Sequence, residues 1–338
     1  MKIPYRTRRA LRRLGLTALV LLLTGIAAWM CWVIWLERFV VYSAGGASLD
    51  FSLSAEYPPG EVALPPEPKE TISIYYNEGE DELEVSTKLK QMTGCYINAE
   101  DLADVEKVRE GLEKLDGEAA VMLDVKNPKG AFYYSTGIGS TIASTVDPEA
   151  VDGLIRDLAD SQHYLIARLP ALRDWEFGLN NVNSGLFAPS MYSLWLDNGY
   201  YWLNPTDTGT MVYLTGIVEE LKGLGFDEVV FTDFYFPASD GYVFEGDKSA
   251  ALTQTAQDLV TICSNDSFAV SFVKGSTGFD VPEGRSRIYL ENVAAEDVSA
   301  AVENFGFTNP AVRLVFLVES NDTRYNEYSV LRPLDTAH

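Results

Sequence analysis

Charged side chains stand at the ends of several apolar runs, where each run gives way to a loop. Asp124 and Lys126 end AVMLDVKNPKG, and Arg168 ends YLIARLP. Asp233 and Tyr235 lie two residues apart in VVFTDFYFP. Residues two apart on a strand share a face, so each run would carry its polar side chains to one end of a sheet. Carboxylates gathered there could donate protons, accept them, or attack an electrophilic carbon.

Asp233 is the strongest catalytic candidate among these side chains. It interrupts an apolar run, and Pro237 follows it closely. A carboxylate in such surroundings is either paired or functional. Glu291 and Glu319 end two later apolar runs, RIYLE and RLVFLVE. For Glu319 and Lys126, an ion pair or simple solvation is the favoured interpretation.

Other reactive centres find little support in the sequence. His163 stands before its apolar run and His338 ends the chain, so neither a Ser-His-Asp triad nor a His-based zinc site is expected. We expect no cofactor and no metal. Cys31 lies in an apolar N-terminal stretch, and Cys95 and Cys263 are predicted to be buried side chains and not a disulfide.

Strands that alternate with helices would position these residues. Eight such strands over about 250 residues predict a (β/α)8 TIM barrel, whose chemistry lies at the C-terminal strand ends. An open doubly wound sheet is the alternative. An extra strand at Ile72–Tyr76 and a long insertion at Leu172–Pro205 would decorate the barrel. The expected strands are Cys95–Asn98, Ala119–Val125, His163–Leu169, Glu228–Phe234, Ser267–Val273, Arg287–Glu291, Arg313–Glu319 and Glu327–Leu331, and the expected helices are Ala99–Leu115, Pro148–Ala159, Gly209–Leu224, Ser249–Cys263 and Ala295–Phe305.

The charge divides the chain into a basic head and an acidic body. The formal net charge is −23, from 26 basic and 49 acidic residues. Seven of the basic residues and one of the acidic residues lie in the first 38 positions, so the remainder holds 19 basic and 48 acidic residues. A body this acidic repels phosphate backbones, so nucleic acid is not an expected partner.

The N-terminal region has the features of a membrane anchor. No charged residue lies between Arg13 and Glu37, and residues 16–36 would span the roughly 30 Å hydrocarbon core as a helix. The basic head at 1–15 predicts a cytoplasmic N-terminus and an extracytoplasmic body in the cell membrane, with a single pass. A cleaved signal peptide is the alternative, and it also exports the body. Residues 37–70 form a Pro-rich linker, and residues 71–338 form the barrel.

Four segments of the body resemble the bacterial family of "putative glycoside hydrolases", which are TIM-barrel proteins related to the α-amylase-like glycosidases. The resemblance implies a barrel, a carbohydrate substrate, and Asp233 as the best candidate for a catalytic carboxylate. It also implies that Asp124 and Arg168 shape the sugar site. The four segments are GCYINAEDL (94–102), AVMLDVKNPKGAFYYST (120–136), HYLIARLPALRD (163–174) and WLDNGYYWLNPTDTGTMVYLTGIVEELKGLGFDEVVFTDFYFPASDG (195–241).

The chain departs from the family pattern at three places. Asn204 follows Trp202 where the family tends to have an Asp, and Tyr235 replaces an Arg. Phe272 stands where an Asp tends to follow the fifth strand. Without that Arg, Asp233 would lack a cation that favours its ionised form. The expected substrate-binding residues are Asp124, Lys126, Arg168, Trp202, Asn204 and Tyr235.

Glycoside hydrolysis usually needs two carboxylates, so Asp233 requires a partner. We expect that partner to be Glu291, across the barrel mouth. Aromatic residues of the insertion, among them Trp175, Trp195 and Tyr200, could stack on sugar rings, although packing is the commoner use of such side chains. The sequence thus predicts a membrane-anchored, extracytoplasmic glycoside hydrolase acting on a polysaccharide or oligosaccharide. A catalytically degenerate carbohydrate-binding barrel and a pure envelope scaffold are the alternatives, and the scaffold predicts no open polar cleft at the strand ends.

Overall fold

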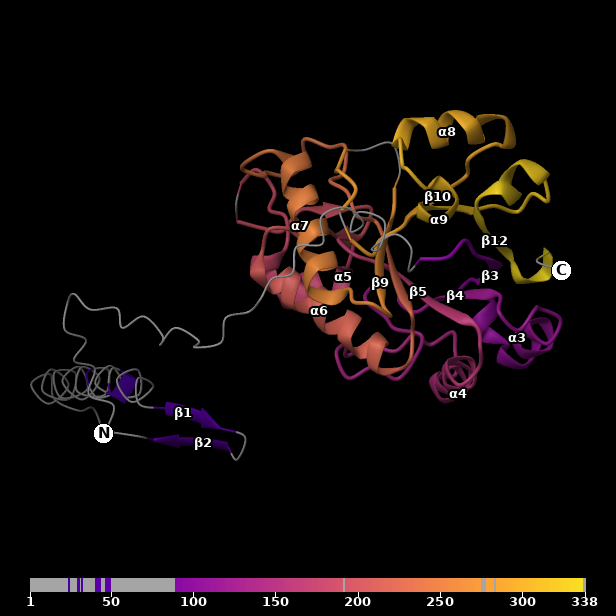
Figure 1. Cartoon of the computed structure of the whole chain (residues 1–338). Helices are drawn as coiled ribbons and strands as arrows, with labels where there is room; N and C mark the ends of the chain where they lie inside the picture. Colours follow the sequence, from indigo (N-terminus) through magenta and orange to yellow (C-terminus); the bar gives the residue numbers. More distant parts are fainter. Residues whose placement is uncertain are drawn as a thin grey trace, which may run out of the picture. The chain divides into compact units, whose positions relative to one another are not determined.

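The computed structural model describes residues 89–190, 192–274, 278–282 and 284–336, together with Thr24, Trp29, Met30, Trp32 and the short strands β1 (Val40–Ser43) and β2 (Gly46–Leu49). The chain divides into two compact units, Met1–Tyr75 and Tyr76–His338 (Figure 1). In the first unit, β1 pairs with β2 in an antiparallel hairpin. Most of the predicted anchor at 16–36, most of the linker and the predicted strand Ile72–Tyr76 lie outside the described residues. In the described part of the chain, no helix combines the length and apolar character needed to cross a membrane.

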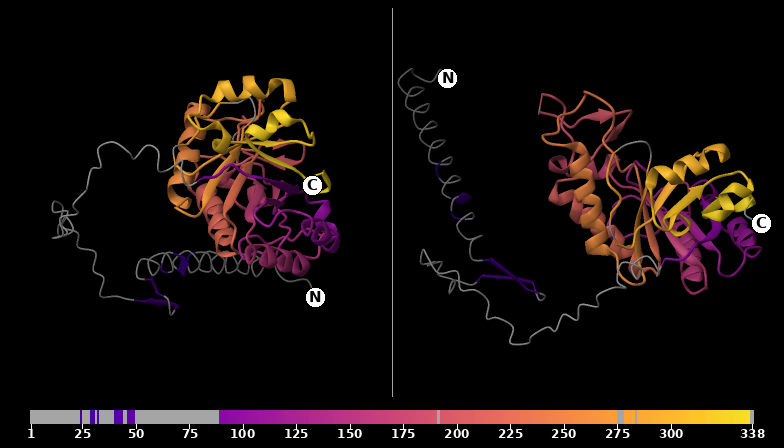
Figure 2. Two further views of the ribbon diagram at one scale, coloured as in Figure 1. Left: turned by 45° about the vertical axis from the view of Figure 1, so that its right-hand side comes forward. Right: turned by 45° about the horizontal axis from the view of Figure 1, so that its top comes forward.

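The second unit is a closed barrel of eight parallel strands, which confirms the barrel and excludes the open sheet (Figure 2). Each barrel strand pairs with the barrel strand before it and the one after it along the chain, and the last strand pairs with the first to close the ring. All eight predicted strands form. They are β3 (Thr93–Ile97), β4 (Ala120–Asp124), β5 (Tyr164–Pro170), β8 (Glu228–Thr232), β9 (Ala269–Val273), β10 (Ile288–Glu291), β11 (Leu314–Leu317) and β12 (Ser329–Pro333).

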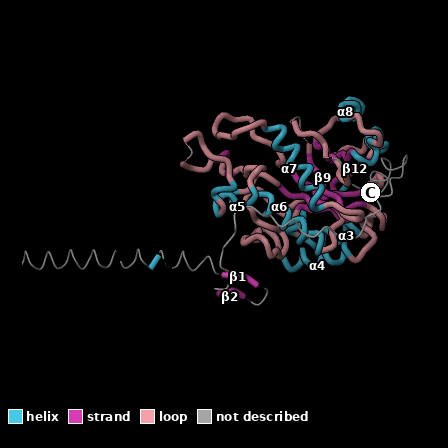
Figure 3. The backbone as a smooth tube through the Cα atoms, turned by 60° about the vertical axis from the view of Figure 1, so that its left-hand side comes forward, coloured by secondary structure: helices cyan, strands magenta, loops and turns pink. Residues whose placement is uncertain are grey.

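Helices surround the strands, as Figure 3 shows in cyan around magenta. The main ones are α3 (Val105–Leu112), α4 (Pro148–Ala159), α6 (Thr208–Gly223), α7 (Lys248–Cys263), α8 (Val298–Phe305) and the short α9 (Pro310–Arg313). Aspartates define several of their starts: in α3, α4, α6 and α7 an N-cap Asp accepts a hydrogen bond from a backbone N–H of the first turn. These caps stabilise the starts of the helices that follow the strands.

Two predicted helices are shorter than expected. Ala99–Leu115 divides into the 3-10 helix η1 (Asp101–Ala103) and α3, because Asp104 leaves the helical conformation to cap α3. Ala295–Phe305 divides into η3 (Ala295–Asp297) and α8, but there Asp297 keeps a helical backbone and makes no side-chain cap hydrogen bond. Helical periodicity detects neither the cap at Asp104 nor the change from a 3-10 helix to an α-helix at Asp297.

The barrel strands are buried on both faces, which explains their nearly continuous apolar sequences. One face fills the barrel interior, and the other packs against the helices. Gly94 allows β3 to lie close against β4, because a Cβ atom there would lie 1.8 Å from the carbonyl oxygen of Ala120. The interior cluster consists of Met92, Ala120, Met122, Ile166, Val230, Tyr289, Val315, Leu317 and Leu331.

The predicted insertion at Leu172–Pro205 follows β5 and carries short elements of its own. These are α5 (Trp175–Asn180), the 3-10 helix η2 (Val182–Ser184), and the paired strands β6 (Leu196–Asp197) and β7 (Tyr200–Tyr201). Leu203 N donates to Leu172 O at 2.7 Å, so the segment returns to its starting point. The insertion therefore stands at the C-terminal end of β5.

Candidate active site

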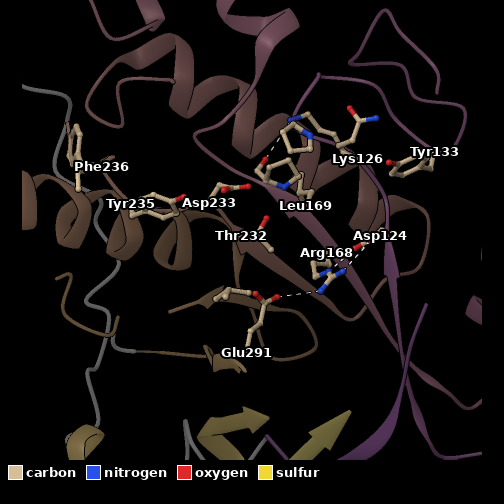
Figure 4. Close-up of a pocket in the computed structure, with 15 residues that line it drawn as sticks. Asp124, Lys126, Tyr133, Arg168, Leu169, Thr232, Asp233, Tyr235, Phe236 and Glu291 are labelled. Atoms are coloured by element: carbon tan, nitrogen blue, oxygen red, sulfur yellow. Dashed lines mark hydrogen bonds and ion pairs between the residues drawn. The ribbon is translucent and has the colours of Figure 1, made fainter. Parts of the chain in front are cut away.

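A cavity of about 650 Å³ opens where the C-terminal ends of β4, β5, β8, β9 and β10 meet (Figure 4). Its polar lining lies at the position where TIM-barrel enzymes carry their chemistry. An open polar cleft at the strand ends is the feature that the pure scaffold alternative does not expect. The lining residues are Asp124, Lys126, Asn127, Pro128, Tyr133, Arg168, Leu169, Pro170, Thr232, Asp233, Tyr235, Phe236, Ala238, Val273 and Glu291.

The strand alternation delivers most of the charged residues to this cavity. Asp124 continues the inward-facing positions 120 and 122 of β4, and Arg168 continues Ile166 of β5. Glu291 continues Tyr289 of β10 in the same way. Because inward-facing residues recur every second position, the side chain beyond the last apolar layer meets the cavity.

Strand alternation does not explain why Asp233 lines the cavity. The predicted strand Glu228–Phe234 ends at Thr232, so Asp233 lies one residue beyond β8 and out of phase with the inward-facing Val230. Its φ of 49° is left-handed, a conformation that non-glycine residues rarely adopt and that clusters at functional sites. The side chain is 19% exposed. Burial raises the pKa of Asp233, and the cations of Arg173 and Lys126 oppose that rise.

Arg168 forms ion pairs with the other two carboxylates of the cavity, those of Asp124 and Glu291. Its Nε donates to Asp124 Oδ1 at 2.6 Å, and its Nη2 donates to Asp124 Oδ2 at 3.1 Å. Its Nη1 lies 3.3 Å from Glu291 Oε1 (dashed in Figure 4). Burial alone would lower the pKa of Arg168, but Asp124 and Glu291 raise it on balance. Asp124 is further fixed by the backbone N–H of Ala99 at 3.1 Å, whereas Glu291 is 38% exposed.

Lys126 lies in the wall of the cavity as a buried ion-pair partner. Its Nζ is 2.6 Å from Asp174 Oδ2, and neither side chain is exposed. Tyr213 donates to the same carboxylate at 2.9 Å, and Asp174 also caps α5 through the N–H of Phe177. The favoured ion-pair interpretation is thus confirmed. The position differs from the rim expected for a sugar contact, because the buried carboxylate draws the ammonium inward.

Of the remaining predicted sugar contacts, only Tyr235 lines the cavity. Trp202 is buried, and its Nε1 donates to Asp197 Oδ2 at 3.3 Å while its ring packs 5.0 Å from that of Tyr235. Asn204 accepts hydrogen bonds from the N–H and hydroxyl of Thr206 in the turn before α6. Trp202 and Asn204 therefore support the site from outside its lining.

Arg173 provides Asp233 with a neighbouring cation, which the sequence did not predict. Its Nη1 lies 3.9 Å from Asp233 Oδ1, and its guanidinium carbon lies 4.0 Å from the centroid of the Tyr200 ring. The expectation that Asp233 lacks a neighbouring cation is therefore wrong. The Arg missing at position 235 is replaced by one from the insertion, some 60 residues earlier. Only its place directly after β5, in ALRDW, could have signalled it.

Phe272, Lys274 and the described cysteines do not line the cavity. Phe272 is buried, and Lys274 donates to Phe279 O at 2.8 Å. Cys95 and Cys263 are free and buried, as predicted, and burial raises their pKa values to about 12 and 11. Cys31 lies outside the described residues. No group of three or more His, Cys, Asp or Glu side chains within the described residues could hold a metal ion.

The family described as "Putative glycosyl hydrolase domain" matches residues 94–266, which is about half of the chain and contains Asp124, Arg168 and Asp233. No curated protein sequence matches. Glu291 lies outside the matched region, so its role depends on the geometry alone.

Solved structures were also compared with this chain. A GH36 α-galactosidase from Geobacillus stearothermophilus in complex with stachyose matches with a TM-score of 0.51 at 11% identity, covering 72% of this chain and 39% of that chain. A hypothetical protein from Ruminiclostridium thermocellum matches with a TM-score of 0.46 at 18% identity, over 53% of this chain and 96% of that one. This chain therefore spans well under half the length of the α-galactosidase. At these identities the likeness concerns the barrel alone.

Proposed function

Because this chain belongs to the family described as "Putative glycosyl hydrolase domain", we propose that its barrel hydrolyses glycosidic bonds of a polysaccharide, with Asp233 and Glu291 as the catalytic carboxylates. One observation carries the proposal: both carboxyl groups line one cavity at the strand C-termini, in contrasting environments. Asp233 is largely buried and its pKa is raised by that burial, whereas Glu291 is more exposed and pairs with Arg168. Carboxylates in contrasting environments are how one site provides both an acid and a base.

The reaction requires the two groups to act from opposite sides of the glycosidic bond. One carboxylic acid protonates the leaving oxygen, while the other carboxylate attacks the anomeric carbon or activates a water. Burial favours the protonated form of Asp233 and suits it to be the donor. Glu291, which pairs with Arg168, would be the carboxylate that attacks or activates the water. A gap of about 5–5.5 Å between the carboxyl groups gives retention, and about 6.5–9.5 Å gives inversion.

The rest of the lining would bind and orient the sugar. Tyr133, Tyr235 and Phe236 present aromatic surface to the cavity, and flat rings suit the apolar faces of sugars. Asp124 and Arg168 supply polar groups for hydroxyls, and the Lys126–Asp174 pair supports the wall behind them. The cavity is large enough for small-molecule recognition, for which about 300–1,000 Å³ is usual.

We further propose that the barrel is extracytoplasmic and attached to the cell membrane by residues 16–36. The support is the uncharged 21-residue stretch after a basic head, since basic residues stay on the cytoplasmic side. A polysaccharide at the cell surface would then be within reach of the barrel.

The experiment is a comparison of reducing-sugar release from a panel of glycans by the parent protein and Asp233→Asn. The substitution removes the ionisable group and keeps the shape, and we expect turnover to fall by about 10²–10⁴-fold. Asp240→Asn, an exposed residue in the same loop, is the matched control and should retain parental turnover. If the parent binds glycans without releasing any sugar, the barrel is a carbohydrate-binding module and the hydrolase proposal fails.

A further inference from the structure

The guanidinium of Arg173 lies between an aromatic ring and the carboxylate of Asp233. Its carbon is 4.0 Å from the centroid of Tyr200, and its Nη1 is 3.9 Å from Asp233 Oδ1. The ring of Trp202 lies further away, at 6.0 Å. Planar guanidinium groups stack on aromatic faces, so the ring limits where the charge can lie.

The backbone around Arg173 is held on both sides. Arg173 forms an antiparallel bridge with Trp202, Leu203 N donates to Leu172 O at 2.7 Å, and Asp174 N donates to Tyr201 O at 3.0 Å. Asp174 is itself fully buried against Lys126. The loop that carries Arg173 is therefore held by backbone contacts with residues 201–203 and by the buried ion pair of Asp174 with Lys126. These contacts fix the backbone from which the guanidinium extends.

Neighbouring cations have other partners. Lys126 is paired with Asp174, and Arg168 is shared between Asp124 and Glu291. Among the described residues, Asp233 is the carboxylate that lies within ion-pair distance of Arg173. The Nε of Arg173 is buried and has no hydrogen-bond partner within the described part of the chain. A buried donor without a partner lowers the stability of the fold. A purely structural role therefore does not explain this side chain.

We propose that Arg173 is a positioning residue of the active site, which the Tyr200 ring holds in place so that its charge orients the Asp233 carboxylate and sets its protonation. The inference rests on the proposed function, because Asp233 is the group that would act on the glycosidic bond. The insertion thus completes the barrel site. Arg173 acts through Asp233 and is not itself among the cavity-lining residues.

The direction of the effect follows from the groups that face Asp233. Arg173 and Lys126 are the cations, and Thr232 at the end of β8 and Tyr235 in the following loop are its hydrogen-bonding neighbours. Asp124, Arg168 and Glu291 share the cavity. Burial raises the pKa of Asp233 and Arg173 counteracts it. Replacing Arg173 by a neutral residue removes that counteraction, so the pKa of Asp233 rises further. The part of the pH–activity profile that reflects the titration of Asp233 then moves to higher pH.

The test is the titration of Asp233 in the parent and in Arg173→Gln, followed by NMR of aspartate labelled at the carboxyl carbon. Asp233→Asn identifies the signal by its disappearance. An opposite charge within about 4–6 Å typically shifts a carboxyl pKa by 1–3 units, so we expect the midpoint to rise by about one pH unit or more in Arg173→Gln. Arg173→Lys keeps the charge, so its Asp233 midpoint should stay close to that of the parent. Arg324→Gln removes one exposed cation elsewhere and should leave the Asp233 midpoint unchanged.

Two further readouts complete the test. In the pH profile of kcat/KM, the Asp233 limb should move upward with the NMR midpoint, and far-ultraviolet circular dichroism should show that each variant is folded. An unchanged or lowered midpoint in a folded Arg173→Gln protein overturns the inference. A parent protein without glycosidase activity would refute the proposed function instead, and the NMR midpoint distinguishes the two failures because it needs no turnover.

Discussion

At the scale of single residues, Asp233 is exceptional for its backbone as well as its side chain. It combines a left-handed φ of 49°, a mostly buried carboxylate and an ion pair with Arg173. Strain of this kind costs of order 1–3 kcal/mol and persists only where the surroundings enforce it. The left-handed backbone lets the first residue after β8 serve a cavity that strand alternation alone would assign to its neighbour Thr232.

Lys126 offers a residue-scale prediction about stability. Lys126→Met should lower the free energy of unfolding by about 3–5 kcal/mol, because it leaves the Asp174 carboxylate buried without its cation. Chemical denaturation followed by tryptophan fluorescence measures the change. Glu106→Gln, which breaks an exposed pair with Arg109, should stay within about 0.5 kcal/mol of the parent. A Lys126→Met protein as stable as that control would mean that the buried pair contributes nothing net.

The sequence predicted part of this site for identifiable reasons. Asp124, Arg168 and Glu291 were found because each stands at the end of an apolar run, and Asp233 because it interrupts one. Arg173 was missed because it follows β5 whereas its partner Asp233 follows β8, and no local sequence pattern encodes that contact. Trp202 and Asn204 were expected in the cavity from family resemblance, but their side chains are engaged with Asp197 and Thr206.

At the scale of elements, the barrel could be predicted almost completely. Parallel strands buried on both faces have near-continuous apolar sequences, so all eight were found, within about two residues at most ends. Helix α4 was predicted at its observed bounds because Asp147 and Pro148 mark its start. The predicted helix Ala99–Leu115 was too long because Asp104 leaves the helical conformation to cap α3, and periodicity does not record such a local conformation.

The contact between β3 and β4 leads to a prediction at this scale. Gly94→Ala should destabilise the barrel by about 3 kcal/mol or more, because the new Cβ would lie 1.8 Å from a backbone oxygen that cannot move without opening the ladder. Thermal unfolding measures the loss. Gly117→Ala is the matched control, because nothing lies within 4 Å of its added Cβ, and it should be neutral or slightly stabilising. Equal melting temperatures for the two variants would contradict the close approach.

At the scale of the whole molecule, the charge of −23 is the sum of a basic head and a strongly acidic body. Part of that acidity has a structural use, since aspartates cap α3, α4, α5, α6 and α7. Among the residues that the structure describes, most of the other acidic side chains are exposed, and such a surface favours uncharged partners over polyanions.

The membrane proposal is tested on the full chain. The parent should stay in the membrane fraction after an alkaline carbonate wash, and its barrel should be open to protease added outside intact cells. Leu22→Arg combined with Ile26→Arg should release the protein, because a central arginine costs about 2.5–3.5 kcal/mol in a membrane helix. The matched pair Leu22→Ala and Ile26→Ala should remain bound. A parent protein found wholly in the soluble fraction would reject the retained anchor.

The most direct test of the central proposal is the turnover of one released glycan by Asp233→Asn, Glu291→Gln and the double variant. Residues that act as a unit are strongly non-additive. If the two carboxylates cleave the bond together, each single change should lower kcat/KM by about 10²-fold or more, and the double change should cost little beyond the larger single loss. A folded Glu291→Gln protein with parental kcat/KM would contradict the account, because Asp233 would then have no partner across the barrel mouth.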